Sequence, residues 1–174
     1  MTKTLEELKY PIGPFQYRGD YDEATRAQYL ESIRSLPARL KELAQSLTEE
    51  QLNTPYRPGG WTIKQLIHHI ADSHVNSYIR FKLALTEDNP AIKPYDQDGW
   101  ANLRDSAVTP VSVSIQLLDA IHTRWVNLLE GFSSEEWQRT AYHPEKQRPV
   151  SLNEFLALYA WHCEHHLQQI KNAV

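Results

Sequence analysis

Two histidines near the C-terminus have the spacing of a metal-binding pair. His162 and His166 are four positions apart within the run His-Cys-Glu-His-His. If residues 151–171 form a helix, which turns about 100° per residue, both imidazoles lie on one face and can reach the same ion. Two histidines hold a divalent metal poorly, so we expect a third ligand from another part of the chain.

The sequence supports this C-terminal helix. Ser151-Leu-Asn-Glu154 has the form of a capping box, in which Ser151 accepts from the Glu154 amide while the Glu154 side chain reaches back. No glycine or proline follows. On the predicted helix His162 and His166 lie on or beside the apolar stripe, whereas His165 falls outside it. The pair therefore faces the interior.

Three earlier segments have the same helical periodicity. Apolar residues recur every three or four positions in residues 21–47, 62–86 and 109–131. Pro37 predicts a kink or break in the first segment. In the last segment, Thr109 is the expected N-cap, with Pro110 at the first helical position.

The remaining residues read as connections. We expect residues 1–20 to form an irregular arm packed by its aromatic residues, and residues 88–110 to form a long connection with one short helix near 100–104. Residues 139–150 are expected to be a connection or a small hairpin. Four long amphipathic helices without a sustained strand pattern predict an all-α, four-helix bundle with long connections, in a single domain spanning 1–174.

Composition excludes several classes of function. The 174 residues are 41% apolar and 23% charged, with a net charge of −4 and no basic cluster, so no nucleic-acid or membrane partner is expected. Residues 1–13 contain no apolar h-region, and no apolar run approaches the length needed to cross a membrane, so we expect neither a leader peptide nor a membrane span. The single cysteine, Cys163, excludes an intramolecular disulfide and fits a reducing compartment. We expect a cytoplasmic protein.

The second long helix offers the third ligand. Bundles build metal sites from inward side chains on facing helices. His69 flanks the apolar stripe of residues 62–86 and is the best partner for His162 and His166. His74 lies inside that stripe and is the second choice.

Several motifs resemble a known family. The chain is similar to the DinB-like superfamily, and within it to the YfiT group of metal-dependent hydrolases. The resemblance rests on segments spread over nearly the whole chain: Tyr10-Pro-Ile-Gly13, Gly59-Gly-Trp61-Thr62, His68-His69-Ile-Ala-Asp72-Ser-His74, Asn76, Tyr78-Ile-Arg-Phe81, Pro94-Tyr-Asp96, and Tyr159-Ala-Trp161-His162 with His165-His166.

The resemblance implies a ligand set. In this family a tryptophan stands eight residues before the first ligand, as Trp61 does before His69, and an HxxxH pair lies on the last helix. It therefore implies a four-helix bundle that binds a divalent metal, zinc or nickel, through His69, His162 and His166. It also implies a cytoplasmic protein that is often a homodimer.

Three functions are compatible with such a site. Three neutral imidazoles leave at least one metal position open, which suits a hydrolase that uses metal-bound water or hydroxide on a small-molecule substrate. The same position could hold a thiolate, which suits a bacillithiol- or mycothiol-dependent S-transferase. The third hypothesis is a non-enzymatic metal-binding stress-response module, in which His74 or Asp96 closes the coordination sphere. Three histidines suit zinc, nickel and iron alike, and we expect Zn²⁺.

No HExxH motif places a general base on a helix. Asp96 in the 88–110 connection is the candidate catalytic residue, with Asp72 and Asn76 as alternatives for proton transfer or for orienting the imidazoles. The basic side chains available for the carboxylates of a thiol cofactor are Arg57, Arg80 and Lys82. We expect His68 and His165 to be surface residues or to support the ligands, Cys163 to be a small buried hydrophobe, and Glu164 to point away from the site.

Overall fold

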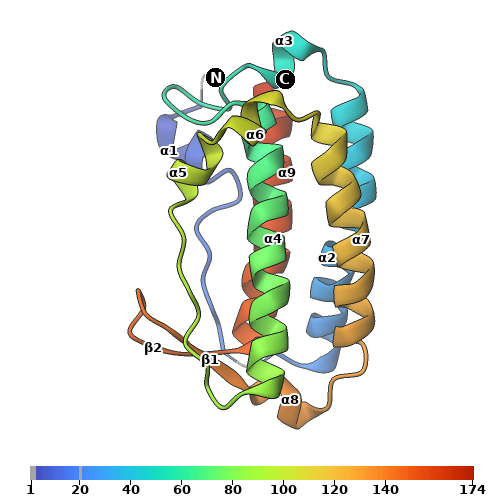
Figure 1. The fold of residues 1–174 in the computed structure, drawn as a ribbon, viewed down its shortest axis with the longest axis vertical. Helices are drawn as coiled ribbons and strands as arrows, with labels where there is room; N and C mark the ends of the chain where they lie inside the picture. The colour runs from blue at the N-terminus through green and yellow to red at the C-terminus, as the bar shows by residue number, and fades with distance from the viewer. Residues whose placement is uncertain (1–2, 20) are drawn as a thin grey trace.

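Four long helices form the body of the molecule. The computed structural model describes residues 3–19 and 21–174. The long helices stand side by side in Figure 1: α2 (Glu23–Gln45), α4 (Ile63–Thr86), α7 (Val111–Leu129) and α9 (Leu152–Ala173). Helix α2 packs against α7 and α9, and α4 packs against the same two helices. The predicted all-α four-helix bundle is confirmed.

The core lies between these four helices. Their inward positions are occupied by large side chains with at most 1% exposure, among them Ile33, Leu36, Leu40, Leu66, Ile70, Phe81, Leu118, Trp125, Phe155 and Leu156. Burying such a side chain contributes about 1.5–3 kcal/mol relative to leaving it in water. The hydrophobic effect therefore fixes which face of each helix points inward, and with it the direction of any polar residue on that face.

Short helices cap and connect the bundle, and two predictions about them were wrong. The N-terminal arm is not wholly irregular, because α1 (Leu5–Lys9) begins at a capping box formed by Thr4 and Glu7. The 88–110 connection contains two short helices instead of one, α5 (Gln97–Ala101) and α6 (Arg104–Val108). The remaining short helices are α3 (Glu49–Leu52) and α8 (Ser134–Gln138).

A small antiparallel hairpin precedes α9. Strands β1 (Thr140–His143) and β2 (Arg148–Ser151) pair with Thr140 opposite Ser151. Ser151 caps α9 by accepting from the Glu154 amide at 3.1 Å, as predicted. The other half of the predicted box is replaced, because the Glu154 carboxylate binds Arg148 and Lys146 of the hairpin.

At two prolines the structure refines the prediction: it shows no break at Pro37, and a different start for α7 at Pro110. Helix α2 runs through Pro37 without a break. Pro37 has no amide hydrogen to donate to the carbonyl of Ile33, but that carbonyl accepts a hydrogen bond from the ring of His122 on α7 instead. Helix α7 begins one residue later than predicted, with Pro110 in the N-cap position and no side-chain cap from Thr109.

The N-terminal arm lies along α9. Trp161 donates to the carbonyl of Gly13 at 3.1 Å, and Gln169 donates to the carbonyl of Lys9 at 2.9 Å. In Figure 1 the arm and α5 occupy the same side of the bundle, beside α4 and α9. Within the described part of the chain, no helix combines the length and apolar character needed to cross a membrane.

Candidate metal centre

Helices α4 and α9 bring three histidines together. His69 comes from α4, and His162 and His166 come from successive turns of α9. One ring nitrogen from each lies within 4.8 Å of the other two. The ring centroids are 4.2 Å apart for His162 and His166, and 5.2–5.5 Å from each of these to His69. The structure thus brings together the three residues that the sequence predicts as ligands.

The amide of Gln169 determines which nitrogen of His166 faces the cluster. Gln169 donates from Nε2 to the Lys9 carbonyl, so its Oε1 is the atom facing His166 Nδ1 at 2.7 Å. An amide oxygen only accepts, so His166 Nδ1 carries the hydrogen. In the neutral ring Nε2 then carries no hydrogen, and its lone pair points toward His162 Nε2, which is 3.0 Å away.

The cluster has the chemistry of a metal site. Burial lowers the pKa of His69 to about 4 and holds the pKa values of His162 and His166 well below the ordinary value. All three rings are therefore neutral at pH 7, and each has a nitrogen lone pair that can bind a metal. Two nitrogens bound tetrahedrally to one zinc ion at about 2.0–2.1 Å are about 3.3 Å apart. The 3.0 Å between the Nε2 atoms of His162 and His166 is close to that spacing. The residues present fit a divalent cation.

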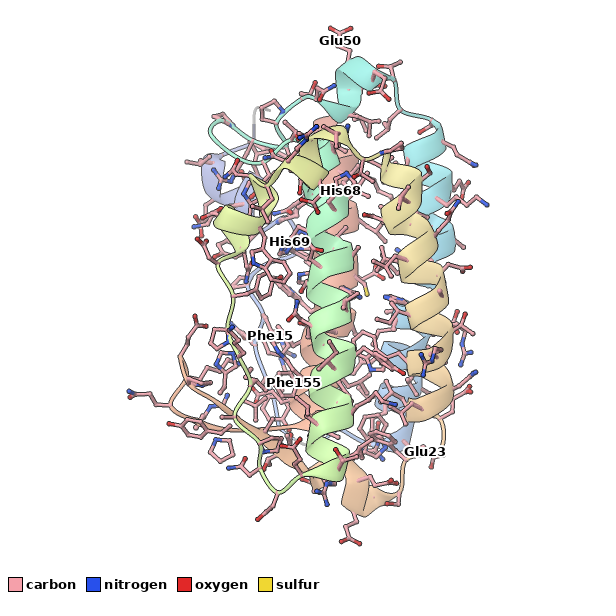
Figure 2. All side chains as sticks on the ribbon, in the orientation of Figure 1. Phe15, Glu23, Glu50, His68, His69 and Phe155 are labelled. Atoms are coloured by element: carbon pink, nitrogen blue, oxygen red, sulfur yellow. The ribbon has the colours of Figure 1, made fainter. Side chains whose placement is uncertain are left out.

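Trp61 forms one wall beside His69. Their ring centroids are 4.6 Å apart, and Trp61 lies directly before the Thr62 capping box that begins α4. The indole nitrogen of Trp61 donates to Asp98 of α5 at 2.9 Å. Figure 2 shows His69 on the side of α4 where α5 and the N-terminal arm lie. Asp98 of the 88–110 connection therefore fixes the position of Trp61 beside His69.

The structure does not bring the predicted catalytic residue Asp96 to the histidines. The Asp96 side chain caps α5 by accepting from the Gly99 amide at 2.9 Å, and Asp98 lines the cavity instead. Asp72 is not among the residues of the cavity wall, although burial raises the pKa of its carboxyl to about 6. Asn76 donates to the Asp72 carbonyl at 2.8 Å.

A cavity of about 530 Å³ adjoins the cluster, large enough for a small molecule. All three histidines line it, and Lys9, Arg57 and Arg80 supply positive charge to its wall. Lys82, the third basic residue proposed from sequence, lies over the Tyr78 ring and is not part of this wall.

The other histidines have separate environments. His68 is not a surface residue: it is buried, with its two ring nitrogens facing Ser114 Oγ at 2.7 Å and the Thr109 carbonyl at 3.2 Å. His165 stacks on Trp161 at the cavity wall, with ring centroids 4.3 Å apart. His74 lies behind the cluster, where its Nε2 is 3.0 Å from His162 Nδ1.

The two residues beside His162 lie as predicted. Cys163 is fully buried, and burial raises the pKa of its thiol. Glu164 points away from the site and forms a bidentate pair with Arg39, at 2.5 and 2.7 Å.

Sequence reasoning missed three residues around the cluster. Gln169 could have been found, because it stands three positions after His166 and so one turn along the same helical face. Asp98 carries no such signal, because its direction depends on the short helix α5. His122 belongs to a helix whose register against α4 the sequence does not determine.

Comparison with known proteins agrees with this architecture. A family model described as the DinB superfamily matches residues 32–170. A Bacillus subtilis (strain 168) protein named "Putative metal-dependent hydrolase YfiT" is 43% identical over 167 residues, which cover 96% of this chain and 94% of that protein. A protein of Bacillus mycoides (strain KBAB4), likewise named a "Putative metal-dependent hydrolase", is 47% identical over 166 residues, covering 95% of both chains.

A solved structure shares the fold. The structure of YfiT from Bacillus subtilis, described as a probable metal-dependent hydrolase with an unusual four-helix bundle topology, matches with a TM-score of 0.93 and 42% identity. The match covers 96% of this chain and 95% of that one.

Proposed function

We propose that this chain, which belongs to the DinB superfamily, is a metal-dependent hydrolase that binds one divalent cation through His69, His162 and His166. The family resemblance inferred from the motifs is confirmed by the relatives and by the shared fold. The observation that carries the proposal is the position of three neutral imidazoles at the wall of a cavity of about 530 Å³. A metal held only by these three residues keeps at least one position open toward that cavity.

The cation and the protein have separate tasks. A divalent cation supplies Lewis acidity, which polarises a carbonyl and lowers the pKa of bound water toward about 7. Zn²⁺ is the cation we propose; neutral imidazoles suit it, as they also suit nickel and iron. Trp61 packs against His69 and limits the access of bulk water. Arg57 and Arg80 place positive charge where an anionic group of a small substrate can bind.

Asp98 replaces Asp96 as the candidate proton acceptor. Among the described residues that line the cavity, Asp98 carries the carboxylate. Its Oδ1 accepts from Trp61 Nε1, so its position is fixed relative to His69. The carboxylate of Asp96 is instead engaged at the start of α5.

A thiol S-transferase that uses bacillithiol or a similar thiol is the second candidate. Lys9, Arg57 and Arg80 line the same cavity and match the carboxylates of such a cofactor. The non-enzymatic module has less support. It requires a closed coordination sphere, but His74 Nε2 faces His162 Nδ1 and Asp96 caps α5. The cytoplasmic location, expected from the composition and from the family resemblance, and the homodimer, expected from the resemblance alone, remain proposals.

One experiment separates these functions. The zinc-loaded protein is assayed on a panel of esters, and on a model electrophile with and without bacillithiol, beside His162→Ala and the control Cys163→Ala. Cys163 is buried one position from His162 and does not line the cavity, so its variant reports local packing alone. Ester hydrolysis without thiol that is lost only in His162→Ala supports the hydrolase. Thiol-dependent conjugation with the same loss refutes it in favour of the transferase, and stoichiometric metal with no turnover favours the binding module.

A further inference from the structure

Two buried histidines, His122 and His74, lie behind the candidate metal centre and form a continuous series of ring-nitrogen contacts with its ligand His162. His122 Nδ1 lies 2.6 Å from the Ile33 carbonyl, His122 Nε2 lies 2.8 Å from His74 Nδ1, and His74 Nε2 lies 3.0 Å from His162 Nδ1. His74 is 0% exposed and His122 is 1% exposed. The series links α2, α7, α4 and α9, and the proposed hydrolysis uses neither His122 nor His74.

The series of contacts begins at the Ile33 carbonyl, which has no amide donor within its own helix. In an α-helix the Ile33 carbonyl would accept from the amide of residue 37, but Pro37 has no amide hydrogen. Ile33 is fully buried, and a buried carbonyl without a donor costs about 1–3 kcal/mol. The His122 ring supplies the missing donor. Because a carbonyl oxygen only accepts, His122 Nδ1 carries a hydrogen.

The hydrogen on His122 Nδ1 determines which ring donates and which accepts in each of the following hydrogen bonds. Burial without an ion-pair partner among the described residues favours the neutral form of His122 and His74, which carries one ring N–H. His122 Nε2 is then an acceptor, so His74 donates to it from Nδ1. His74 Nε2 is in turn an acceptor, so His162 donates to it from Nδ1. His162 Nε2 is left without a hydrogen, so its lone pair is free.

The other tautomer of His162 leaves a buried contact without a hydrogen. If His162 carried its hydrogen on Nε2, one of two buried contacts would lose its hydrogen: a bare His122 Nδ1 would face the Ile33 carbonyl oxygen at 2.6 Å, or a bare His162 Nδ1 would face the bare His74 Nε2 at 3.0 Å. In either contact two lone pairs repel each other, and neither His74 nor His122 lines the cavity, where water could separate them. The Ile33 carbonyl and the burial of His74 therefore select one tautomer for all three rings.

We propose that His74 and His122 are positioning residues that hold His162 in the tautomer with Nε2 free to bind a metal, with Pro37 as the origin of this constraint. The inference rests on the proposed metal site. His162 and His166 then present two bare Nε2 atoms to each other at 3.0 Å. Unlike His74 and His122, both residues line the cavity, where water in the metal-free protein or a cation in the loaded protein satisfies these lone pairs. Partners that orient a metal-binding histidine in this way contribute about 10–100-fold to metal affinity.

Replacement of His74 tests the proposal. His74→Phe removes both hydrogen bonds but keeps an aromatic ring among Trp125 and Tyr159, whose centroids lie 5.9 and 5.1 Å from that of His74. His74→Gln keeps one donor and one acceptor and is the conservative rescue. His68→Phe is the matched control, because His68 is another buried histidine of α4 whose partners are Ser114 and Thr109.

Two readouts are needed. Competition with a chromophoric chelator gives the Zn²⁺ affinity, for which we expect a loss of about 10–100-fold in His74→Phe, no comparable loss in His68→Phe and substantial recovery in His74→Gln. Long-range ¹H–¹⁵N NMR of the metal-free protein gives the tautomers. We expect the hydrogen of His162 on Nδ1 in the wild type, and a shift toward Nε2 in His74→Phe.

The outcomes distinguish this inference from the proposed function. A wild-type His162 with its hydrogen on Nε2, or a folded His74→Phe that binds zinc as tightly as His68→Phe, overturns the inference and leaves the metal site intact. A wild-type protein that does not bind zinc stoichiometrically overturns the proposed function, and the NMR spectrum still decides the tautomer. Thermal unfolding of each variant confirms that it is folded, and the wild-type spectrum decides the tautomer even if a variant is not.

Discussion

Gln169 provides a sharp test of the candidate metal centre, because its immediate neighbour is a matched control. Gln169→Leu removes the acceptor for His166 Nδ1–H at 2.7 Å and the donor to the Lys9 carbonyl at 2.9 Å. Gln168→Leu makes the same change one residue earlier, where the amide donates to the partly exposed Asn172 at 3.0 Å.

The expected magnitude follows from the role of this bond. Without Gln169, the His166 ring is free to rotate or to move its hydrogen to Nε2, the atom that faces the cluster. Loss of such a partner lowers metal affinity by about 10–100-fold, or about 1.4–2.7 kcal/mol. Gln168 does not line the cavity, so Gln168→Leu should leave zinc affinity unchanged.

The assay is a zinc titration against a chromophoric chelator at pH 7.5, with thermal unfolding of the metal-free proteins as the folding control. If folded Gln169→Leu binds zinc as tightly as Gln168→Leu, the assignment of His166 Nε2 as a ligand atom held by Gln169 is refuted.

Three further predictions concern stability, reactivity and metal removal. Burial alone would raise the pKa of the Glu154 carboxyl, but bonds from Arg148 and Lys146 hold that pKa below the ordinary value. The stabilisation from this ion pair is therefore present above about pH 4.5 and is lost as the carboxyl is protonated at lower pH. Glu154→Gln should therefore cost about 2 kcal/mol in urea unfolding at pH 7, and an equal cost at pH 3 would contradict this. Cys163 should resist alkylation at pH 8 until the protein unfolds, because it is fully buried and burial raises the pKa of its thiol; rapid labelling of the native protein would show otherwise. Chelation of the metal should abolish ester hydrolysis and added Zn²⁺ should restore it, whereas undiminished turnover in excess chelator would argue against metal-dependent chemistry.

Helical periodicity explains why the three candidate ligands could be predicted. On a helix the direction of each side chain follows from its distance along the sequence to the apolar stripe. His69, His162 and His166 all flank such stripes, and the bundle places those stripes against one another. The Ser151 cap of α9 could also be predicted, because it involves only the neighbouring Glu154 amide, whereas the Glu154 side chain pairs with the hairpin and Thr109 does not cap α7.

The errors arise where long-range contacts decide. Asp96 and Asp98 are two residues apart in a connection, and the start of α5 determines that Asp96 caps the helix while Asp98 meets Trp61. Pro37 leaves α2 unbroken because His122, from a different helix, satisfies the carbonyl that the proline cannot serve. Neither partnership has a signal in the spacing of the sequence.

The most direct test of the central claim is zinc X-ray absorption spectroscopy of the stoichiometric zinc complex. We predict three imidazole nitrogens at about 2.0–2.1 Å, with His69→Ala, His162→Ala and His166→Ala each losing stoichiometric zinc at the same chelator concentration. A sulfur ligand at about 2.3 Å, which would implicate Cys163, or full zinc occupancy in any of the three variants would contradict the three-histidine site.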